Sequence, residues 1–499
     1  MPTTNAIREY NLPPITPKIA VAGLVFLAAT VRFHGLFTND FHADEALFAV
    51  WARLIATWRD PLLSNEIVDK PPLLFYIQAM MYPLMASPAP WVARLPNLAA
   101  SLLLVPLTAR LAWNLYGDML AAVTAMIVAA CSPLLVQFSA TAFTDPLLTA
   151  VIMASLVAAG SARRGPTASS GERVGLLSGL LLGLALATKY QAALFVPLHV
   201  ALAFFCKWRG DDWRRWLAGI SLPVMALGLW DLARGAGAGL WAQQMYNYGG
   251  LRLVWSWELW PRLESWMALW SAFIGSPVLA FTLLLLAPVF FALLIQQQDR
   301  PTALDQLLLL FLLGYVVLHW LVAVPVWDRY LLPAAPLAAI LLGRFVSRVL
   351  AFFGAALPLP AGLKMLIPVT AILAMMLPAG VAAREAQFAI GVRQTKGEGV
   401  AQLVRELQDA PYGAVLYDHW YSWQWRYYLL DSRVYLSWFA HRDALVADLN
   451  VFLDEDEPRY LALPQAPAAI PVQRRLRDSG YSLAVVRSVP GITLYRITP

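Results

Sequence analysis

The loop that follows the first hydrophobic segment contains the residues of this chain that are best suited to chemistry. Two adjacent acids, Asp44 and Glu45, are followed later in the loop by an acid beside a base, Asp69 and Lys70. Ionisable side chains at a membrane boundary are costly unless they are solvated, paired or used in a reaction. Because four of them gather in one loop of an otherwise apolar chain, we expect chemistry at the membrane surface.

Other polar residues border or interrupt apolar segments further along the chain. Asp145 lies in Thr-Asp-Pro, Lys189 lies in Thr-Lys-Tyr, and Arg329 precedes Tyr330. A proline after Asp145 suits the first turn of a helix, so this acid is either functional or a helix N-cap. Lys189 interrupts an apolar stretch and therefore requires water or a bonded partner, for which an outer carboxylate such as Asp231 is the structural choice.

The elements that position these residues are membrane helices. Hydrophobic residues make up 59% of the chain and charged residues only 14%, whereas a soluble domain is about 25% charged. Apolar runs of about 20 residues recur, which is long enough to cross a hydrocarbon core. We therefore expect a polytopic α-helical membrane protein with about 11 transmembrane helices. The expected spans are 18–36, 94–112, 119–138, 144–161, 174–188, 190–206, 214–232, 275–295, 305–324, 331–350 and 364–383.

The basic loop residues predict the orientation of these spans. Placing them in the cytoplasm satisfies the positive-inside bias. The N-terminus is then cytoplasmic, and every candidate residue above lies on the extracytoplasmic face of the plasma membrane. The net charge of +6 is spread over loops rather than gathered in one patch, which argues against nucleic-acid binding. The basic residues concerned are Arg163, Arg164, Arg173, Lys207, Arg209, Arg214, Arg215, Arg300, Arg344, Arg348 and Lys364.

The composition divides the chain into two domains. We expect a transmembrane domain at 1–383, whose first outer loop is 37–93, and a soluble α/β domain at 384–499. After Gly380 the long apolar runs end, and short strand-like runs alternate with helical segments. An odd number of spans places this second domain outside the cell. The chain has no nucleotide-binding glycine loop and no zinc-type Cys/His spacing.

Two outer loops contain apolar and aromatic residues suited to the membrane surface. Apolar residues from Leu47 to Trp58 repeat at helical spacing, which predicts an interfacial helix, and a second surface helix is expected from Leu73 to Met85. This pair either folds the Asp69-Lys70 motif back toward the first acids or is a connector without catalytic meaning. The long aromatic loop 233–274 either anchors the chain at the interface or forms a wall beside a lipid or sugar substrate.

In their order along the chain, the motifs resemble those of the GT-C membrane glycosyltransferases. The resemblance is to the branch of bacterial proteins similar to protein O-mannosyltransferases and lipid A aminoarabinose transferases, and it covers about residues 1–383. Each motif is weak alone, but the order and the shared membrane face make the set specific. The motifs are Asp44-Glu45, Asp69-Lys70-Pro71-Pro72-Leu73, Ala93-Arg94-Leu95-Pro96, Thr144-Asp145-Pro146, Thr188-Lys189-Tyr190 and Arg329-Tyr330-Leu331-Leu332-Pro333.

The resemblance implies an inverting glycosyltransferase that moves a sugar from a polyprenyl-phosphate-linked donor to a hydroxyl acceptor on the outer face of the membrane. Asp44 takes the position of the catalytic base, which removes the proton of the acceptor hydroxyl. Lys70 and Arg329 are placed to stabilise the charge that develops on the leaving lipid phosphate. The acceptor is a protein, a glycolipid or a cell-wall glycan. Without the resemblance, Asp44 and Glu45 are equally well explained as solvated acids in a first helical turn.

The resemblance also implies roles for the remaining residues. Glu45, Lys189 and Tyr330 would bind the substrate or its phosphate. Asp69 and Asp145 would hold a divalent metal ion, for which carboxylate and phosphate oxygens are suitable ligands. Asp69 is alternatively the salt-bridge partner of the adjacent lysine, and some members of this broad fold need no metal. No nucleotide cofactor is expected.

Two rival functions and two local assignments stay open. A secondary transporter also buries charges between helices, but it would show broken helices near the bilayer midplane and a two-fold repeat. A non-catalytic scaffold of envelope assembly would tolerate the loss of Asp44. His42 is a metal ligand, a residue that tunes the base, or an ordinary polar group. The aromatic run 418–428 either caps the active site or lies on the membrane.

Overall fold

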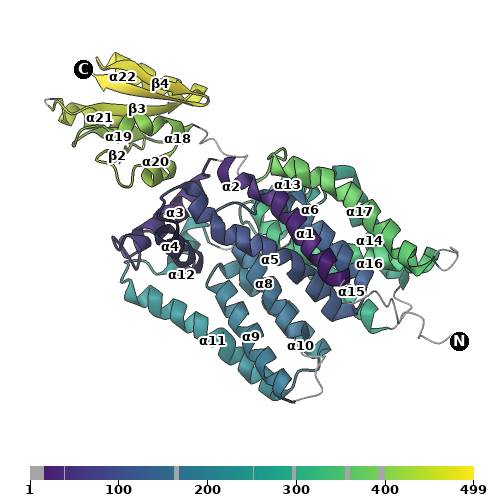
Figure 1. Ribbon diagram of the computed structural model, residues 1–499. Helices are drawn as coiled ribbons and strands as arrows, with labels where there is room; N and C mark the ends of the chain where they lie inside the picture. Colours follow the sequence, from purple (N-terminus) through teal and green to yellow (C-terminus); the bar gives the residue numbers. More distant parts are fainter. Residues whose placement is uncertain are drawn as a thin grey trace.

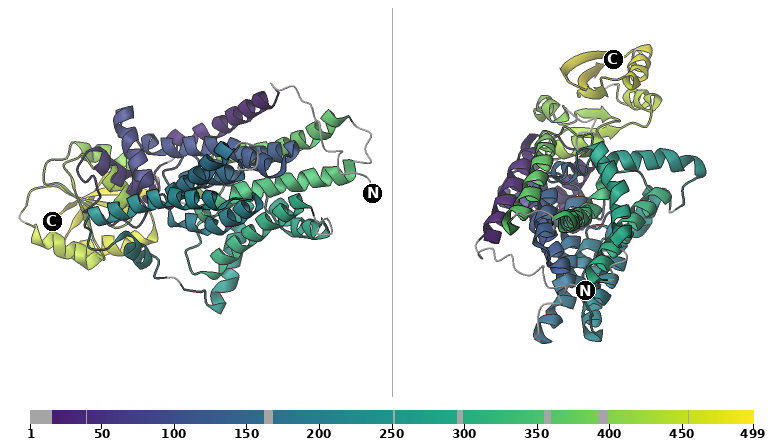
Figure 2. Two further views of the ribbon diagram at one scale, coloured as in Figure 1. Left: turned by 90° about the horizontal axis from the view of Figure 1, so that it is seen from below. Right: turned by 90° about the vertical axis from the view of Figure 1, so that its right-hand side faces the viewer.

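The structure of the chain is a computed structural model. A bundle of long helices forms its larger part, and a small sheet with helices lies at one end of the bundle (Figures 1 and 2). Arg163 and Arg164, two of the basic residues that predict the orientation, lie outside the described residues. The structure describes residues 16–38, 40–161, 168–250, 252–294, 299–354, 360–391, 399–453 and 455–499.

Seven helices in the described part of the chain are long and apolar enough to cross a membrane. Shorter apolar helices accompany them, and each range that the sequence predicts as a span contains a helix. The polytopic helical fold is therefore confirmed, while the number of spans stays a prediction. The helical elements are α1 (Thr16–Phe33), α2 (Gly35–Thr38), α3 (Ala43–Ala56), α4 (Leu73–Met85), α5 (Pro90–Tyr116), α6 (Met119–Cys131), α7 (Pro133–Gln137), α8 (Thr144–Ser161), α9 (Ala168–Leu186), η1 (Tyr190–Phe195), α10 (Val196–Phe205), α11 (Gly210–Ala233), α12 (Leu240–Asn247), α13 (Ser256–Ser271), α14 (Pro277–Leu294), α15 (Arg300–Leu321), η2 (Asp328–Ala334), α16 (Ala335–Gly354) and α17 (Ala361–Arg384).

Glycines allow two pairs of these helices to approach closely. A Cβ atom added at Gly179 of α9 would lie 2.0 Å from the carbonyl oxygen of Trp216 in α11. One added at Gly343 of α16 would lie 2.3 Å from the carbonyl oxygen of Ala121 in α6. Small residues at such contacts permit the backbone-to-backbone packing that associates helices in a membrane. A larger residue at Gly179 or Gly343 would push the helices apart.

The first outer loop folds into α3 and α4, which pack inside the protein. The expectation that lipid covers the apolar face of α3 is wrong for Trp51, which is only 1% exposed, while the place of α3 at the membrane interface stays a prediction. Trp51 and Phe48 pack against Phe75 of α4. Helix α20 (Ser422–Tyr428), which belongs to the aromatic run 418–428, also packs against α3. Protein therefore covers the apolar face of α3 that lipid was expected to cover.

The C-terminal part contains a five-stranded mixed sheet with the order β2-β1-β3-β5-β4. Strand β1 pairs in parallel with β2 and β3, and β5 pairs antiparallel with β3 and β4. Because successive strand residues face opposite sides, Leu416 and Ala462 lie in one buried cluster and Tyr417 and Leu461 in another. The predicted small α/β domain is confirmed. Its other elements are α18 (Val400–Leu403), α19 (Arg405–Gln408), β1 (Val415–Asp418), β2 (Tyr435–Trp438), α21 (Arg442–Val451), β3 (Arg459–Pro464), η4 (Pro467–Ala469), α22 (Ile470–Asp478), β4 (Ser482–Val489) and β5 (Ile492–Thr498).

Candidate active site

Asp44 lies in the first turn of α3 and forms an ion pair with Arg329 of η2. The Arg329 Nη1 and Asp44 Oδ2 atoms are 2.7 Å apart, and the side chains are 10% and 33% exposed. The guanidinium also packs over the rings of Phe143 and Trp327, at 4.9 Å from each ring centroid. The sequence motifs do not predict this pair, because they imply separate roles for the two residues.

The surroundings of Asp44 keep its carboxylate ionised. Burial raises the pKa of Asp44, but the nearby Arg329, together with His42 and Lys70, outweighs burial and lowers the pKa below its usual value. A general base must be deprotonated before it can accept a proton, and Asp44 meets this condition at neutral pH. The same ion pair makes it a weak base, because Arg329 favours the charged form.

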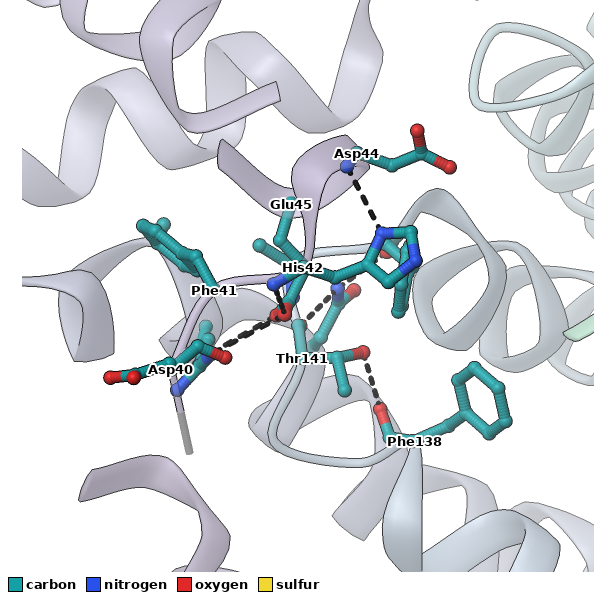
Figure 3. A network of polar contacts seen from close by, with 12 residues as sticks. Asp40, Phe41, His42, Asp44, Glu45, Phe138 and Thr141 are labelled. Atoms are coloured by element: carbon teal, nitrogen blue, oxygen red, sulfur yellow. Dashed lines mark hydrogen bonds and ion pairs between the residues drawn. The ribbon is translucent and has the colours of Figure 1, made fainter. Parts of the chain in front are cut away.

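His42 and Glu45 fix the start of α3 (Figure 3). The backbone N–H of Asp44 donates to His42 Nδ1 at 3.1 Å, and the backbone N–H of His42 donates to Glu45 Oε2 at 3.0 Å. In this structure His42 therefore acts as a helix N-cap, the ordinary polar role among its three alternatives. The carboxylate of Asp44 points away from Glu45 (Figure 3).

Glu45 is a buried anchor between three segments. Its side chain is 0% exposed, and its Oε1 atom lies 3.1 Å from Arg94 Nε. The same oxygen accepts the backbone N–H of Ala142 at 2.7 Å, and Arg94 Nη2 donates to the carbonyl oxygen of Asp40 at 3.1 Å. Glu45 thus ties α3 to α5 and to the segment before α8. Its part in substrate binding stays a prediction.

Lys70 is bonded to its neighbour Asp69 just before α4. The Lys70 Nζ and Asp69 Oδ2 atoms are 2.6 Å apart, and Lys70 Nζ also donates to Gln244 Oε1 at 3.3 Å. Asn247 Nδ2 donates to Asp69 Oδ2 at 2.9 Å. Helix α12 of the long aromatic loop therefore contacts this pair directly, and Asp69 has the salt-bridge role that was its alternative to metal binding.

A second buried pair joins Lys189 to Asp145, rather than to the suggested Asp231. The Lys189 Nζ and Asp145 Oδ1 atoms are 2.5 Å apart, and Lys189 Nζ lies 4.5 Å from the centroid of the Tyr330 ring. The Tyr330 hydroxyl is hydrogen-bonded to the Tyr248 hydroxyl at 3.0 Å. The two tyrosines therefore connect the Lys189–Asp145 pair to the other lysine.

Tyr248 is a site residue that the sequence motifs do not identify. Lys70 Nζ lies 5.0 Å from the centroid of its ring. Burial raises the pKa of Tyr248, but Lys70 and Lys189 outweigh burial and lower it. A phenol of lowered pKa is a strong hydrogen-bond donor to an anionic oxygen. The only sequence signal for Tyr248 is its place among the aromatic residues of the outer loop.

The predicted metal ligands do not form a cation site in the described part of the chain. No group of three or more His, Cys, Asp or Glu side chains is arranged there to hold a metal ion. Asp69 and Asp145 each lie against a lysine ammonium, which repels a cation. These residues do not fit the divalent ion that the resemblance implies, and we assign no step to one.

Part of the chain matches the model of a known protein family. Residues 69–230 match the model of the family described as dolichyl-phosphate-mannose-protein mannosyltransferase. This segment includes Asp69, Lys70, Asp145 and Lys189. None of the curated proteins that were compared matches the chain.

Two solved structures share the fold over most of this chain. The crystal structure of ArnT from Cupriavidus metallidurans bound to undecaprenyl phosphate is 15% identical, with a TM-score of 0.66, over 97% of this chain and 98% of that chain. The oligosaccharyltransferase of Archaeoglobus fulgidus, tethered with an acceptor peptide, is 10% identical, with a TM-score of 0.56, over 91% of this chain and 69% of that chain. The chain therefore has the fold of the GT-C membrane glycosyltransferases, as its motifs predict, and residues 69–230 match the mannosyltransferase family model.

Proposed function

We propose that this chain is an inverting glycosyltransferase that moves a sugar from a polyprenyl-phosphate-linked donor to a hydroxyl acceptor. The observation that carries the proposal is the Asp44–Arg329 ion pair, which lies next to two lysine–aspartate pairs bridged by Tyr248 and Tyr330. The reaction needs a carboxylate for the acceptor proton and cations for the leaving phosphate. The mannosyltransferase family match and the undecaprenyl-phosphate complex of ArnT support this class of donor.

Donor binding changes the partner of Arg329. Without a donor, each cation of the cluster is balanced by a carboxylate. A donor phosphate brings its own negative charge, and a guanidinium binds phosphate with two parallel hydrogen bonds. We propose that the phosphate takes Arg329 from Asp44. The pKa of Asp44 then rises, because the cation that favoured its charged form is occupied.

Sugar transfer then follows from this arrangement. The acceptor hydroxyl oxygen attacks the anomeric carbon while its proton passes to Asp44. The bond between the anomeric carbon and the phosphate oxygen breaks, and its electron pair stays on the lipid phosphate. Lys70 and Arg329 stabilise the charge that collects there. Attack from the face opposite the leaving group inverts the anomeric centre.

The other site residues position these groups. Tyr330 and Tyr248 donate hydrogen bonds to the phosphate, and the Lys189 ammonium holds the Tyr330 ring through a cation–π contact. Asp69 and Asp145 keep the two lysines in place until a ligand arrives. This role replaces the metal binding that the resemblance implies for them.

The proposed site faces the outside of the cell, at the plasma membrane. The positive-inside bias of the basic loops supports a cytoplasmic N-terminus, and an odd number of spans within 1–383 supports an extracytoplasmic domain at 384–499. The acceptor is a hydroxyl group of a protein, a glycolipid or a cell-wall glycan.

Lipid binding tests the donor class directly. Polyprenyl phosphate should bind to the purified protein, and polyprenol, which has the same chain without the phosphate, should bind much more weakly. Arg329→Gln and Lys70→Gln should weaken binding of the phosphate lipid only. Arg475→Gln is a matched control, because Arg475 is 42% exposed in an ion pair with Asp443 on the C-terminal domain. Equal binding of the two lipids would refute recognition of a lipid phosphate.

A further inference from the structure

The C-terminal domain contacts the start of α3, and the proposed reaction leaves this contact without a role. Tyr427 of α20 is 1% exposed. Its ring packs edge-on against Phe41, with centroids 4.7 Å apart, and its hydroxyl donates to the carbonyl oxygen of Pro88 at 2.5 Å. Phe41 directly precedes His42, the N-cap of the helix that carries Asp44.

The far end of α3 is held by the same tyrosine. Arg53 Nη1 donates to the carbonyl oxygen of Tyr427 at 2.7 Å, and the guanidinium carbon lies 5.1 Å from the centroid of the Tyr427 ring. Arg53 also pairs with Asp431, just beyond α20, and its side chain is only 8% exposed. Tyr427 therefore contacts the segment before α3 and a residue in its last turn.

Two more bonds from the C-terminal domain reach the first outer loop. The backbone N–H of Gly399 donates to Asp40 Oδ2 at 3.0 Å. Arg426 of α20 pairs with Glu66 through both carboxylate oxygens. Asp40 and Phe41 lie on the segment that leads to Asp44 (Figure 3). The C-terminal domain thus contacts the residues directly before the proposed base.

We infer that Tyr427 is a positioning residue, which through Phe41 and Arg53 sets the position of α3 and hence that of Asp44 relative to Arg329. This inference rests on the proposed function. Arg329 lies on η2 in the helical bundle, so the distance between base and phosphate depends on where α3 is held. A displacement of about 1 Å at a reacting group can lower a rate by about 100-fold.

A positioning role has a kinetic signature that a purely structural role lacks. Tyr427→Ala should lower kcat by about 10- to 100-fold while the KM for the donor stays within about twofold, because Lys70 and Arg329 do not contact Tyr427. Tyr427→Phe keeps the ring contacts and loses only the hydroxyl's bonds to Pro88 and to the Tyr82 hydroxyl, so it should restore most of kcat. Trp438→Ala is the control, because this ring is 61% exposed on the same domain.

Hydrogen exchange of the full-length protein supplies a readout that does not depend on activity. Tyr427→Ala should speed amide exchange in residues 40–46 and leave residues 482–498 unchanged, and Trp438→Ala should change neither. In a folded Tyr427→Ala protein, wild-type kcat and wild-type exchange at 40–46 would overturn the inference.

A second variant covers the case in which Tyr427→Ala does not fold. Phe41→Leu removes the ring against which Tyr427 packs and should show the same exchange pattern and the same selective loss of kcat. Unchanged exchange at 40–46 in this variant would overturn the inference. If the wild type transfers no sugar, the proposed function fails, and the exchange data alone decide whether the C-terminal domain positions α3.

Discussion

Replacing Arg329 with glutamine should shift the acid limb of the pH–rate profile as well as lower the rate. Arg329 Nη1 lies 2.7 Å from Asp44 Oδ2. Burial raises the pKa of Asp44, and Arg329 is the largest influence that lowers it. Glutamine keeps an amide donor but removes the positive charge. The pKa of Asp44 should therefore rise in Arg329→Gln.

The structure sets the size of this shift. Two unit charges about 4 Å apart interact by about 4 kcal/mol at an effective dielectric constant of about 20. Because the Asp44 side chain is 33% exposed, solvent screens part of this, and we take about half, or about 2 kcal/mol. Losing an interaction of this size should raise the pKa of Asp44 and move the acid limb of the kcat/KM profile to higher pH. The loss of a donor to the leaving phosphate should also lower kcat by about 100-fold or more.

Initial rates of donor consumption across a pH series measure both effects. The profile of kcat/KM reports the free enzyme, whereas that of kcat reports the donor complex. Since we propose that the phosphate takes Arg329 from Asp44, the wild type should show a lower acid pKa in kcat/KM than in kcat. In Arg329→Gln the two values should coincide. Arg475→Gln should leave both profiles unchanged.

Two results would refute this reasoning. If kcat falls in Arg329→Gln while the acid limb of kcat/KM stays in place, Arg329 does not control the pKa of Asp44. If the two acid pKa values are equal in the wild type, donor binding does not separate Asp44 from Arg329.

Three further predictions concern single side chains. Lys70→Gln should lower kcat by about 100-fold through the loss of a donor to the phosphate, and unchanged donor turnover would contradict this. Glu45→Gln should destabilise the fold by about 3 to 5 kcal/mol, because it removes the carboxylate bonded to the buried Arg94; an unshifted unfolding curve in detergent would argue against that anchor. Burial raises the pKa of Asp418 from its usual value of 3.8 to about 6. The pKa of Asp418 is higher in the folded than in the unfolded protein. Protonated Asp418 therefore stabilises the fold fully below about pH 4, and this stabilisation of about 3 kcal/mol is lost as the pH rises through about 6. Hydrogen exchange of the C-terminal strands, measured below about pH 4 and above about pH 6 and corrected for intrinsic rates, should show this loss of stability. In Asp418→Asn the difference between the two pH values should disappear.

The sequence predicts the helices well because the membrane constrains them. A span such as 364–383 must be apolar along its whole length, and α17 occupies this range. The sequence predicts that Asp44, Lys189 and Arg329 lie near one another, because all three lie in or beside loops on the same predicted face of the membrane. Which acid meets which base does not follow from the sequence, because it depends on how η2 and α8 pack against α3. The partner of Lys189 in the structure is therefore Asp145, another outer carboxylate, and not the Asp231 that the sequence suggested.

The buried position of α3 could not be predicted from its own residues. An apolar face such as that of Leu47–Trp58 is covered equally well by lipid or by protein. The cover comes from α4 and from α20, whose Tyr427 lies far along the chain. Tyr248 was missed for a similar reason, since nothing in the loop distinguishes it from the aromatic residues around it.

Donor consumption by wild type and Asp44→Asn, measured side by side, tests the central claim most directly. Purified protein in liposomes receives a panel of radiolabelled polyprenyl-phosphate sugars, with host membrane extract as the source of acceptor. Asparagine keeps the shape of the side chain but cannot take the acceptor proton. We predict that the wild type consumes a donor and that Asp44→Asn does not, while Asp443→Asn, whose native side chain is 56% exposed, retains activity. Equal consumption by the wild type and Asp44→Asn would contradict the assignment of Asp44 as the base.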